Sequence, residues 1–231
     1  RGSNVTVTMF TRLARILIPA MVLAACGAEA PDEPVVSAAE TVEPRPEIYA
    51  DFELTADLSH LSDSQRAMIG VLIEASRIMD DLFWRQAFND GYSDWLASIE
   101  DSKARRFAEL NYGPWDRLAD EAPFIRGFGA KPKGANFYPA DMSKEEFEAA
   151  YLPGKKGLYS LVRRDSAGEL MLVPYHVAYK DELHRATELL REAAGLAEDQ
   201  QFATYLKLRA AALISDDFQT SDLFWMDVKS N

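Results

Sequence analysis

The chain lacks the residues and motifs on which several common sites depend. Cys26 is the only cysteine among the 231 residues, so no internal disulfide can form. No G-x-S-x-G turn presents a serine nucleophile, and no glycine-rich loop has the spacing that cradles a phosphate. These absences exclude a disulfide-stapled fold and leave the chain without the signatures of serine hydrolases and P-loop enzymes.

Basic residues are also in short supply and form no block. The sequence holds 25 Lys and Arg against 37 Asp and Glu, which gives a formal net charge of −12. A surface this negative repels the phosphate backbone of DNA and RNA. We therefore expect no nucleic-acid partner.

Histidines are too few and wrongly spaced for a zinc site on a helix. Of the three, His176 and His184 are eight positions apart, whereas such a site needs a spacing of four with a glutamate after the first histidine. Val177 and Arg185 follow instead. We expect these histidines to be surface or helix-packing residues, and we expect no metal ligand, catalytic residue or bound cofactor in this chain.

The N-terminal residues have the pattern of an export signal. Arg12 and Arg15 precede an apolar run at residues 16–25, which would rise only about 15 Å as a helix. That is too short for a bilayer core of about 30 Å and typical of a signal peptide. Residues 1–26 therefore read as a signal, with the natural start at Met9.

The signal ends in Leu-Ala-Ala-Cys, which resembles a bacterial lipobox and predicts lipidation of Cys26. The alternative is an ordinary signal peptide with a chance cysteine. A lipid on Cys26 would anchor the protein in the membrane of the bacterial cell envelope. Ala28, rather than an aspartate, favours the periplasmic face of the outer membrane.

Residues 27–47 contain several prolines among Ala, Glu and Val and no aromatic residue, so we expect an extended tether there. The folded part then spans residues 48–231. Ser62 and Gln65 form a capping-box pair that begins a long amphipathic helix. Strands at 158–164 and 170–173 flank a turn with Gly168, and helices follow at about 176–197 and 199–214. The expected fold class is mainly α with a small β-hairpin element.

One stretch of the helix expected at about 176–197 resembles a Nudix pyrophosphatase motif but departs from it. Within residues 187–196, Arg191 stands where a carboxylate is needed and Gly195 is one place late. Val173 stands where the early glycine of that motif belongs. We interpret the stretch as an ordinary amphipathic helix.

Two loops rich in Gly, Pro, Asn and aromatic residues are the best candidates for a binding site. Rings and amides presented from ordered loops suit an extended peptide, whose backbone needs donors and acceptors and whose side chains need apolar pockets. The candidate substrate-binding residues are Asn111, Tyr112, Trp115, Asp116, Asn136 and Tyr138. The alternative is a structural loop in which Trp115 and Tyr138 fill the core.

Several longer words in the sequence resemble the bacterial branch of the dipeptidyl-peptidase III family of zinc peptidases. They are TADLS (55–59), DDLFW (80–84), NYGPWDRL (111–118), GANFYPADM (134–142) and SDLFWMD (221–227). The resemblance runs from about residue 52 onward. It implies a mainly helical, two-lobed hydrolase, of which this chain would form part of one lobe.

The resemblance also implies zinc in the full-length enzyme, with a catalytic glutamate, on a helix downstream of the region seen here. No position of this chain matches those ligands, so we expect an N-terminal portion, truncated before the zinc motif and inactive alone. The whole enzyme would release dipeptides from the N-termini of peptides. The alternative function is a non-catalytic lipoprotein that binds peptides or a partner protein.

Overall fold

The computed structural model describes residues 41–229. The predicted signal peptide, the lipidation site Cys26 and most of the predicted tether lie outside the described residues. No helix within 41–229 is long and apolar enough to cross a membrane.

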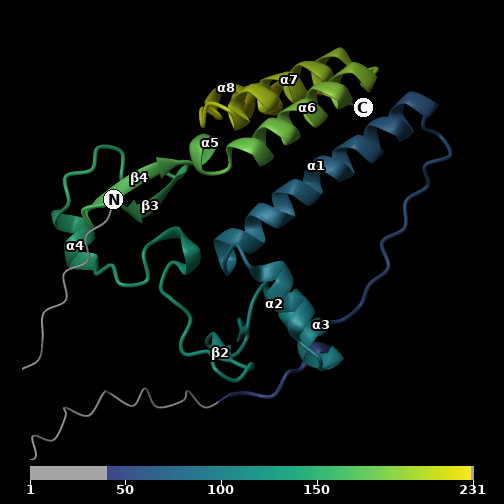
Figure 1. Cartoon of the computed structure of the whole chain (residues 1–231). Helices are drawn as coiled ribbons and strands as arrows, with labels where there is room; N and C mark the ends of the chain where they lie inside the picture. The colour runs from purple at the N-terminus through teal and green to yellow at the C-terminus, as the bar shows by residue number, and fades with distance from the viewer. Residues whose placement is uncertain (1–40, 230–231) are drawn as a thin grey trace, which may run out of the picture. The chain divides into compact units, whose positions relative to one another are not determined.

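Helices dominate the described part, as expected, and strands are short (Figure 1). The α-helices are α1 (Asp63–Ala87), α2 (Tyr92–Ser98), α3 (Ser102–Asn111), α4 (Lys144–Ala149), α5 (Tyr175–Ala178), α6 (Lys180–Leu196), α7 (Gln200–Leu213) and α8 (Gln219–Asp227). Two 3₁₀ turns are η1 (Pro46–Ile48) and η2 (Ala135–Phe137). The strands are β1 (Trp115–Asp116), β2 (Ala122–Pro123), β3 (Ser160–Arg164) and β4 (Leu170–Pro174). The expected mainly α fold with a small β element is confirmed.

Helix α1 begins at the predicted capping box. The Ser62 hydroxyl accepts a hydrogen bond from the Gln65 backbone N–H at 3.1 Å, and the Gln65 side chain accepts one from the Ser62 N–H at 2.9 Å. Ser62 also donates to Glu198 at 2.7 Å, just beyond the end of α6. The start of α1 is therefore tied to the helix against which it packs.

Helices α6, α7 and α8 lie side by side (Figure 1). Asp199 separates α6 from α7, because its carboxylate accepts from the N–H groups of Gln201 and Phe202 and caps the second helix. Small residues let the two helices approach closely: Ala193 and Ala194 pack with Leu206 in one buried cluster. The expected single helix at 176–197 is interrupted at Tyr179, so a short α5 precedes α6.

The hairpin is formed by β3 and β4, with Arg164 opposite Leu170 and Ser160 opposite Pro174. Gly168 adopts φ +85° in the connecting turn, a backbone conformation that favours glycine. The first strand starts at Ser160, two residues later than predicted. The second two-stranded sheet, β1 with β2, was not anticipated from the sequence.

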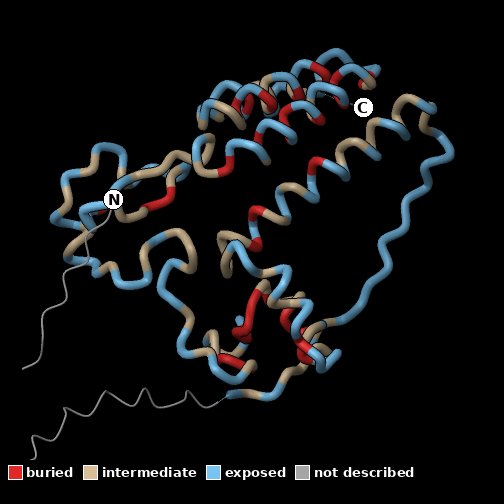
Figure 2. The backbone as a smooth tube through the Cα atoms, in the orientation of Figure 1, coloured by how far each residue is buried: buried red, intermediate tan, exposed pale blue. Residues whose placement is uncertain are grey.

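A second group of buried residues lies around α3 (Figure 2). Phe107 and Ala108 are fully buried there and pack with Phe124. Val42 and Tyr49 pack against this cluster, and the Val42 N–H donates to the Pro123 carbonyl at 3.0 Å. Residues 42–48 thus contact the folded part, although the sequence pattern placed most of them in an extended tether. Their partners are far along the chain, so composition alone did not indicate this packing.

Candidate functional site

The first candidate loop leaves α3 through a sharp reversal. Tyr112 adopts a left-handed conformation with φ 54° and ψ 45°, and Gly113 follows with φ 148°. The Gly113 N–H donates to the Ala108 carbonyl at 3.2 Å, which closes the helix end. After this turn, Tyr112 lies against α1, whereas Trp115 lies at the pocket described below.

Asn111 and Asp116 lie inside the fold and hold the loop together. The Asn111 amide donates to the Phe107 carbonyl, and its oxygen accepts from the Tyr49 hydroxyl and the Arg117 N–H, each at 3.2 Å. Asp116 has no exposed surface, and its carboxylate accepts from Arg45 Nη2 at 2.6 Å and from the Leu118 N–H at 2.9 Å. Neither residue is among those that line the pocket described below.

Tyr112 faces α1 rather than the second loop. Its hydroxyl donates to Asp80 Oδ1 at 2.7 Å, and its ring meets Phe83 edge-on with centroids 4.7 Å apart. The hydrogen bond to the Asp80 carboxylate, together with burial, raises the pKa of the Tyr112 hydroxyl. The structure thus separates Asn111, Tyr112 and Asp116 from the other candidates.

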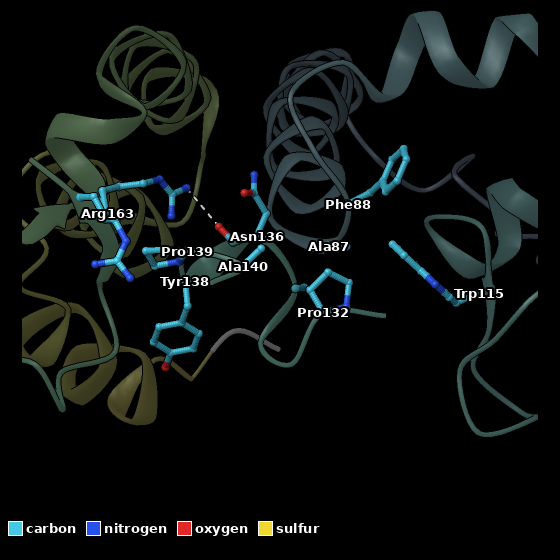
Figure 3. A pocket seen from close by; sticks show the side chains of 11 residues that line it. Ala87, Phe88, Trp115, Pro132, Asn136, Tyr138, Pro139, Ala140 and Arg163 are labelled. Atoms are coloured by element: carbon cyan, nitrogen blue, oxygen red, sulfur yellow. Dashed lines mark hydrogen bonds between the residues drawn. The ribbon is translucent and has the colours of Figure 1, made fainter. Parts of the chain in front are cut away.

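The remaining three candidates come together around a pocket of about 470 Å³. Trp115, Asn136 and Tyr138 line it (Figure 3). Phe88, at the end of α1, and Pro132 extend the apolar wall, while Arg163 and Arg164 of β3 add charge. This volume lies within the range of small-molecule sites.

Trp115 is largely a core residue that also lines this pocket. It is 7% exposed, and its indole N–H donates to the Gly129 carbonyl at 2.9 Å. Its ring packs edge-on against Phe88 and Phe128 at 5.7 and 5.9 Å between centroids. The ring is therefore fixed in place, as both the binding interpretation and the core-filling alternative require.

A hydrogen bond to α1 positions Asn136, and a close approach to a glycine positions Tyr138. The Asn136 amide donates to the Arg85 carbonyl at 2.8 Å, which fastens the second loop to α1. Gly134 adopts φ +82°, and a Cβ built there would meet the Tyr138 ring at 2.3 Å. The Tyr138 side chain folds back over this glycine, and the residue is 37% exposed, so it is not a core-filling residue.

The two arginines are pocket residues that the sequence analysis did not single out. Arg164 forms a paired hydrogen bond with Glu146, at 2.7 and 3.0 Å, and donates to Asp141 at 2.9 Å. These bonds hold the pKa of the Glu146 and Asp141 carboxyls below their ordinary values. Adjacent arginines at the end of a predicted strand were the available signal.

The histidines do not fit a zinc site. His60 and His184 are exposed, and His176 Nδ1 lies 2.7 Å from Asp216 Oδ2 in an isolated pair. Within residues 41–229, no three His, Cys, Asp or Glu side chains are grouped so that they could hold a metal ion. The donor set of this part of the chain is thus unsuited to the zinc that the resemblance implies.

Similarity to known proteins extends over most of the chain. No protein-family model matches the sequence. "Nudix hydrolase 3" of Arabidopsis thaliana is 28% identical over 244 residues, covering 79% of this chain and 32% of the plant protein. Residues 187–196, which resemble a Nudix motif in part, lie in α6. Thr187, Leu189 and Ala193 of this stretch are buried. Arg191 in place of a carboxylate, and Gly195 one place late, argue against a Nudix motif in this helix.

Two solved structures match more closely in sequence. Dipeptidyl-peptidase III from Caldithrix abyssi is 35% identical, with a TM-score of 0.73, over 79% of this chain and 37% of the other. The dipeptidyl-peptidase III of Corallococcus sp. strain EGB is 32% identical, with a TM-score of 0.75, over 83% of this chain and 39% of the other. The chain thus spans less than two fifths of the length of either structure. In fold and in sequence, it is related to the bacterial dipeptidyl-peptidase III proteins and corresponds to a part of them, as the sequence words predicted.

Proposed function

We propose that this chain supplies a scaffold and one wall of the substrate cleft in a zinc-dependent exopeptidase that releases dipeptides from peptide N-termini. The observation that carries the proposal is the match to two dipeptidyl-peptidase III structures, at 32–35% identity and TM-scores of 0.73–0.75. Identity at this level over about four fifths of the chain supports more than a shared architecture.

In this proposal the zinc and the catalytic glutamate belong to the larger share of the enzyme, which the chain does not span. The match covers 37–39% of the solved structures, so most of each enzyme has no counterpart here. No group in residues 41–229 is suited to hold the metal. We therefore assign no catalytic step to the residues of this chain.

The work proposed for this chain is to hold peptide at the pocket between the two loops. Phe88, Trp115 and Tyr138 offer ring surfaces on which apolar side chains can lie. Asn136 is already bonded to α1 through its amide, so the loop that carries Tyr138 is pre-positioned. In this proposal Asn111 and Asp116 do not contact the peptide. They hold the first loop in place through their buried hydrogen bonds.

A direct test uses the purified full chain. Zinc analysis, an assay with a dipeptidyl-naphthylamide substrate and calorimetric titration with short peptides are performed on one preparation. We expect peptide binding without turnover and without stoichiometric zinc. Stoichiometric zinc with turnover would contradict the assignment of the chemistry to the rest of the enzyme.

A chimera separates the proposal from its alternative, a non-catalytic peptide- or protein-binding lipoprotein. In this chimera, residues 41–229 replace the matching portion of a related dipeptidyl-peptidase III. An alternative binding protein would fold there without restoring turnover. If peptides bind neither to the chain alone nor to the chimera, peptide binding is contradicted under both functions.

We also propose that the protein is anchored by lipid at Cys26 on the periplasmic face of the outer membrane. The supporting observation is the Leu-Ala-Ala-Cys ending of the signal-like residues 1–26. Growth with radiolabelled palmitate should label the protein expressed from Met9. The Cys26→Ser variant should lose the label and leave the membrane fraction, and a variant that keeps both would contradict the anchor.

A further inference from the structure

Arg163 is a pocket-lining arginine without a carboxylate partner in the described part of the chain. Its Nη1 donates to the carbonyls of Val162 and Phe137 at 2.8 and 3.3 Å, and its Nη2 donates to the carbonyl of Asn136 at 3.0 Å. No salt bridge within residues 41–229 includes this side chain. Backbone carbonyls therefore orient the guanidinium without neutralising its charge.

The bonding pattern leaves part of the guanidinium available. An arginine side chain carries five N–H donors in a rigid plane, and three of these donate to the carbonyls just named. The Nε–H makes no bond within the described residues, and one Nη2 hydrogen also remains. The Nε and Nη2 atoms lie along one edge of a guanidinium plane, the edge that can meet a carboxylate in a bidentate manner.

The neighbouring Arg164 provides the contrast. It also lines the pocket, but Glu146 binds it in a bidentate manner and Asp141 adds a second carboxylate. Two arginines at adjacent positions of one strand thus differ in charge balance. Arg164 ties α4 to the hairpin, whereas Arg163 brings to the pocket a guanidinium that has no ion-pair partner among residues 41–229.

Apart from Asn136 and Arg164, the rest of the pocket lining is apolar or aromatic. Phe88, Trp115 and Pro132 lie on one side of it, and Arg163 lies toward the other, as Figure 3 shows. A ligand that fits this arrangement carries an anionic group next to a large apolar side chain. A peptide with a hydrophobic last residue has both features, because its terminal carboxylate adjoins that side chain.

We propose that Arg163 binds a peptide carboxylate while the adjacent apolar side chain lies against Phe88 and Trp115. This inference rests on the proposed peptide-binding function and names the group that this site selects. The carboxylate can come from the peptide C-terminus or from an Asp or Glu side chain, and the arms of the experiment distinguish these sources. In either case the planar fork sets the preference for carboxylate.

The test is calorimetric titration of the full chain with three probes. They are the tetrapeptide Ala-Ala-Ala-Phe as the free acid, the same peptide as its C-terminal amide, and Ala-Ala-Glu-Phe as its amide. We expect the free acid to bind about tenfold more tightly than the first amide, the effect of one charge-assisted pair. Recovery of tight binding by the Glu-containing amide would support a side-chain carboxylate as a ligand.

Variants separate recognition from support of the loop. Arg163→Gln should abolish the difference between acid and amide, and Arg163→Lys, which keeps the charge but loses the fork, should retain part of it. Arg126→Gln is the matched control, because Arg126 is exposed and has no ion pair among the described residues. It should leave the difference unchanged.

Each contrary result has a distinct meaning. Equal binding of acid and amide by the wild-type chain overturns the inference and leaves the proposed function standing. An Arg163→Gln variant that weakens acid and amide equally also overturns it, because such a loss reflects loop support alone. Absence of binding for all three probes overturns the inference and the peptide-binding function together.

Discussion

Arg45 and Asp116, 71 positions apart in the chain, form an ion pair in which Nη2 and Oδ2 are 2.6 Å apart. The carboxylate is fully buried, whereas the arginine side chain is 43% exposed. Asp116 also accepts from the Leu118 N–H, so it fixes the turn after β1 as well as the segment before η1. A residue that the sequence presented as a binding candidate is therefore a structural anchor.

The first prediction concerns this anchor. Asp116→Ala should lower the free energy of unfolding by about 2–3 kcal/mol, because it leaves a charged donor and a loop N–H without their acceptor. Chemical denaturation of the full chain measures the change. Asp51→Asn is the control, since Asp51 is 96% exposed and lies 3.5 Å from Arg106. A loss for Asp116→Ala as small as that of the control would contradict the anchoring role.

The second prediction compares two glycines with positive φ. Gly127→Ala, at φ +91° with nothing near the added methyl, should cost only the left-handed strain of about 1 kcal/mol. Gly134→Ala, at φ +82°, should cost more, because its Cβ would meet the Tyr138 ring at 2.3 Å. Thermal melting measures both effects.

The same pair of variants tests the pocket. Displacement of the Tyr138 ring in Gly134→Ala should weaken binding of Ala-Ala-Ala-Phe, while Gly127→Ala should bind it as the wild type does. Equal affinity in the two variants would show that the position of Tyr138 does not matter to the peptide.

The third prediction concerns pH and the contact between α4 and the hairpin. The pKa of Glu146 is held below its ordinary value by its hydrogen bonds to Arg164. A carboxyl whose pKa is lowered by folding stabilises the protein at pH values above its ordinary pKa. This stabilisation is lost as the pH falls through the pKa of the folded state. Glu146→Gln should therefore lower the melting temperature at pH 7, and the difference should shrink below about pH 4.

Glu145→Gln is the control for this comparison. Glu145 shares the first turn of α4 but makes no hydrogen bond to Arg164 in the described part of the chain. A pH-dependent difference of the same size for Glu145→Gln would assign the effect to the helix end instead of the arginine.

The fourth prediction concerns a late tyrosine ionisation. Burial, together with a 2.7 Å hydrogen bond to Asp81, raises the pKa of Tyr92 to about 12. A raised folded-state pKa stabilises the protein below the ordinary value of 10.0, and the effect disappears as pH rises through about 12. The difference between ultraviolet titrations of wild type and Tyr92→Phe should thus contain one step near pH 12.

Asp81→Asn should move that step to lower pH, because the replacement removes the carboxylate charge beside the hydroxyl. Asp63→Asn should leave it in place, since Asp63 is fully exposed and pairs with Arg66. A Tyr92 step near the ordinary tyrosine value in the wild type would contradict the described environment.

Local chemistry allowed much of the fold to be predicted. The Ser62 and Gln65 pair defines the start of α1, and the turn around Gly168 defines the hairpin, because each signal is complete within a few residues. The break at Asp199 was visible for the same reason. The packing of Val42 and Arg45 was not, because their partners Pro123 and Asp116 are distant in sequence.

The candidate site was predicted only as a set of residue types. Aromatic and amide residues in two loops indicated recognition, but their directions depend on the left-handed turn at Tyr112 and on the fold of Tyr138 over Gly134. Arg163 was overlooked because its role follows from what surrounds it, carbonyls instead of carboxylates. Such a difference between Arg163 and Arg164 has no counterpart in the sequence pattern.

The central claim is tested most directly by turnover of a chimera. Residues 41–229 replace the matched portion of the Caldithrix abyssi dipeptidyl-peptidase III, and release of naphthylamine from a dipeptidyl-naphthylamide is measured beside the parent enzyme and this chain alone. The account predicts turnover by the chimera and none by the chain alone. A chimera that folds and holds zinc as the parent does, yet releases no product, would contradict it.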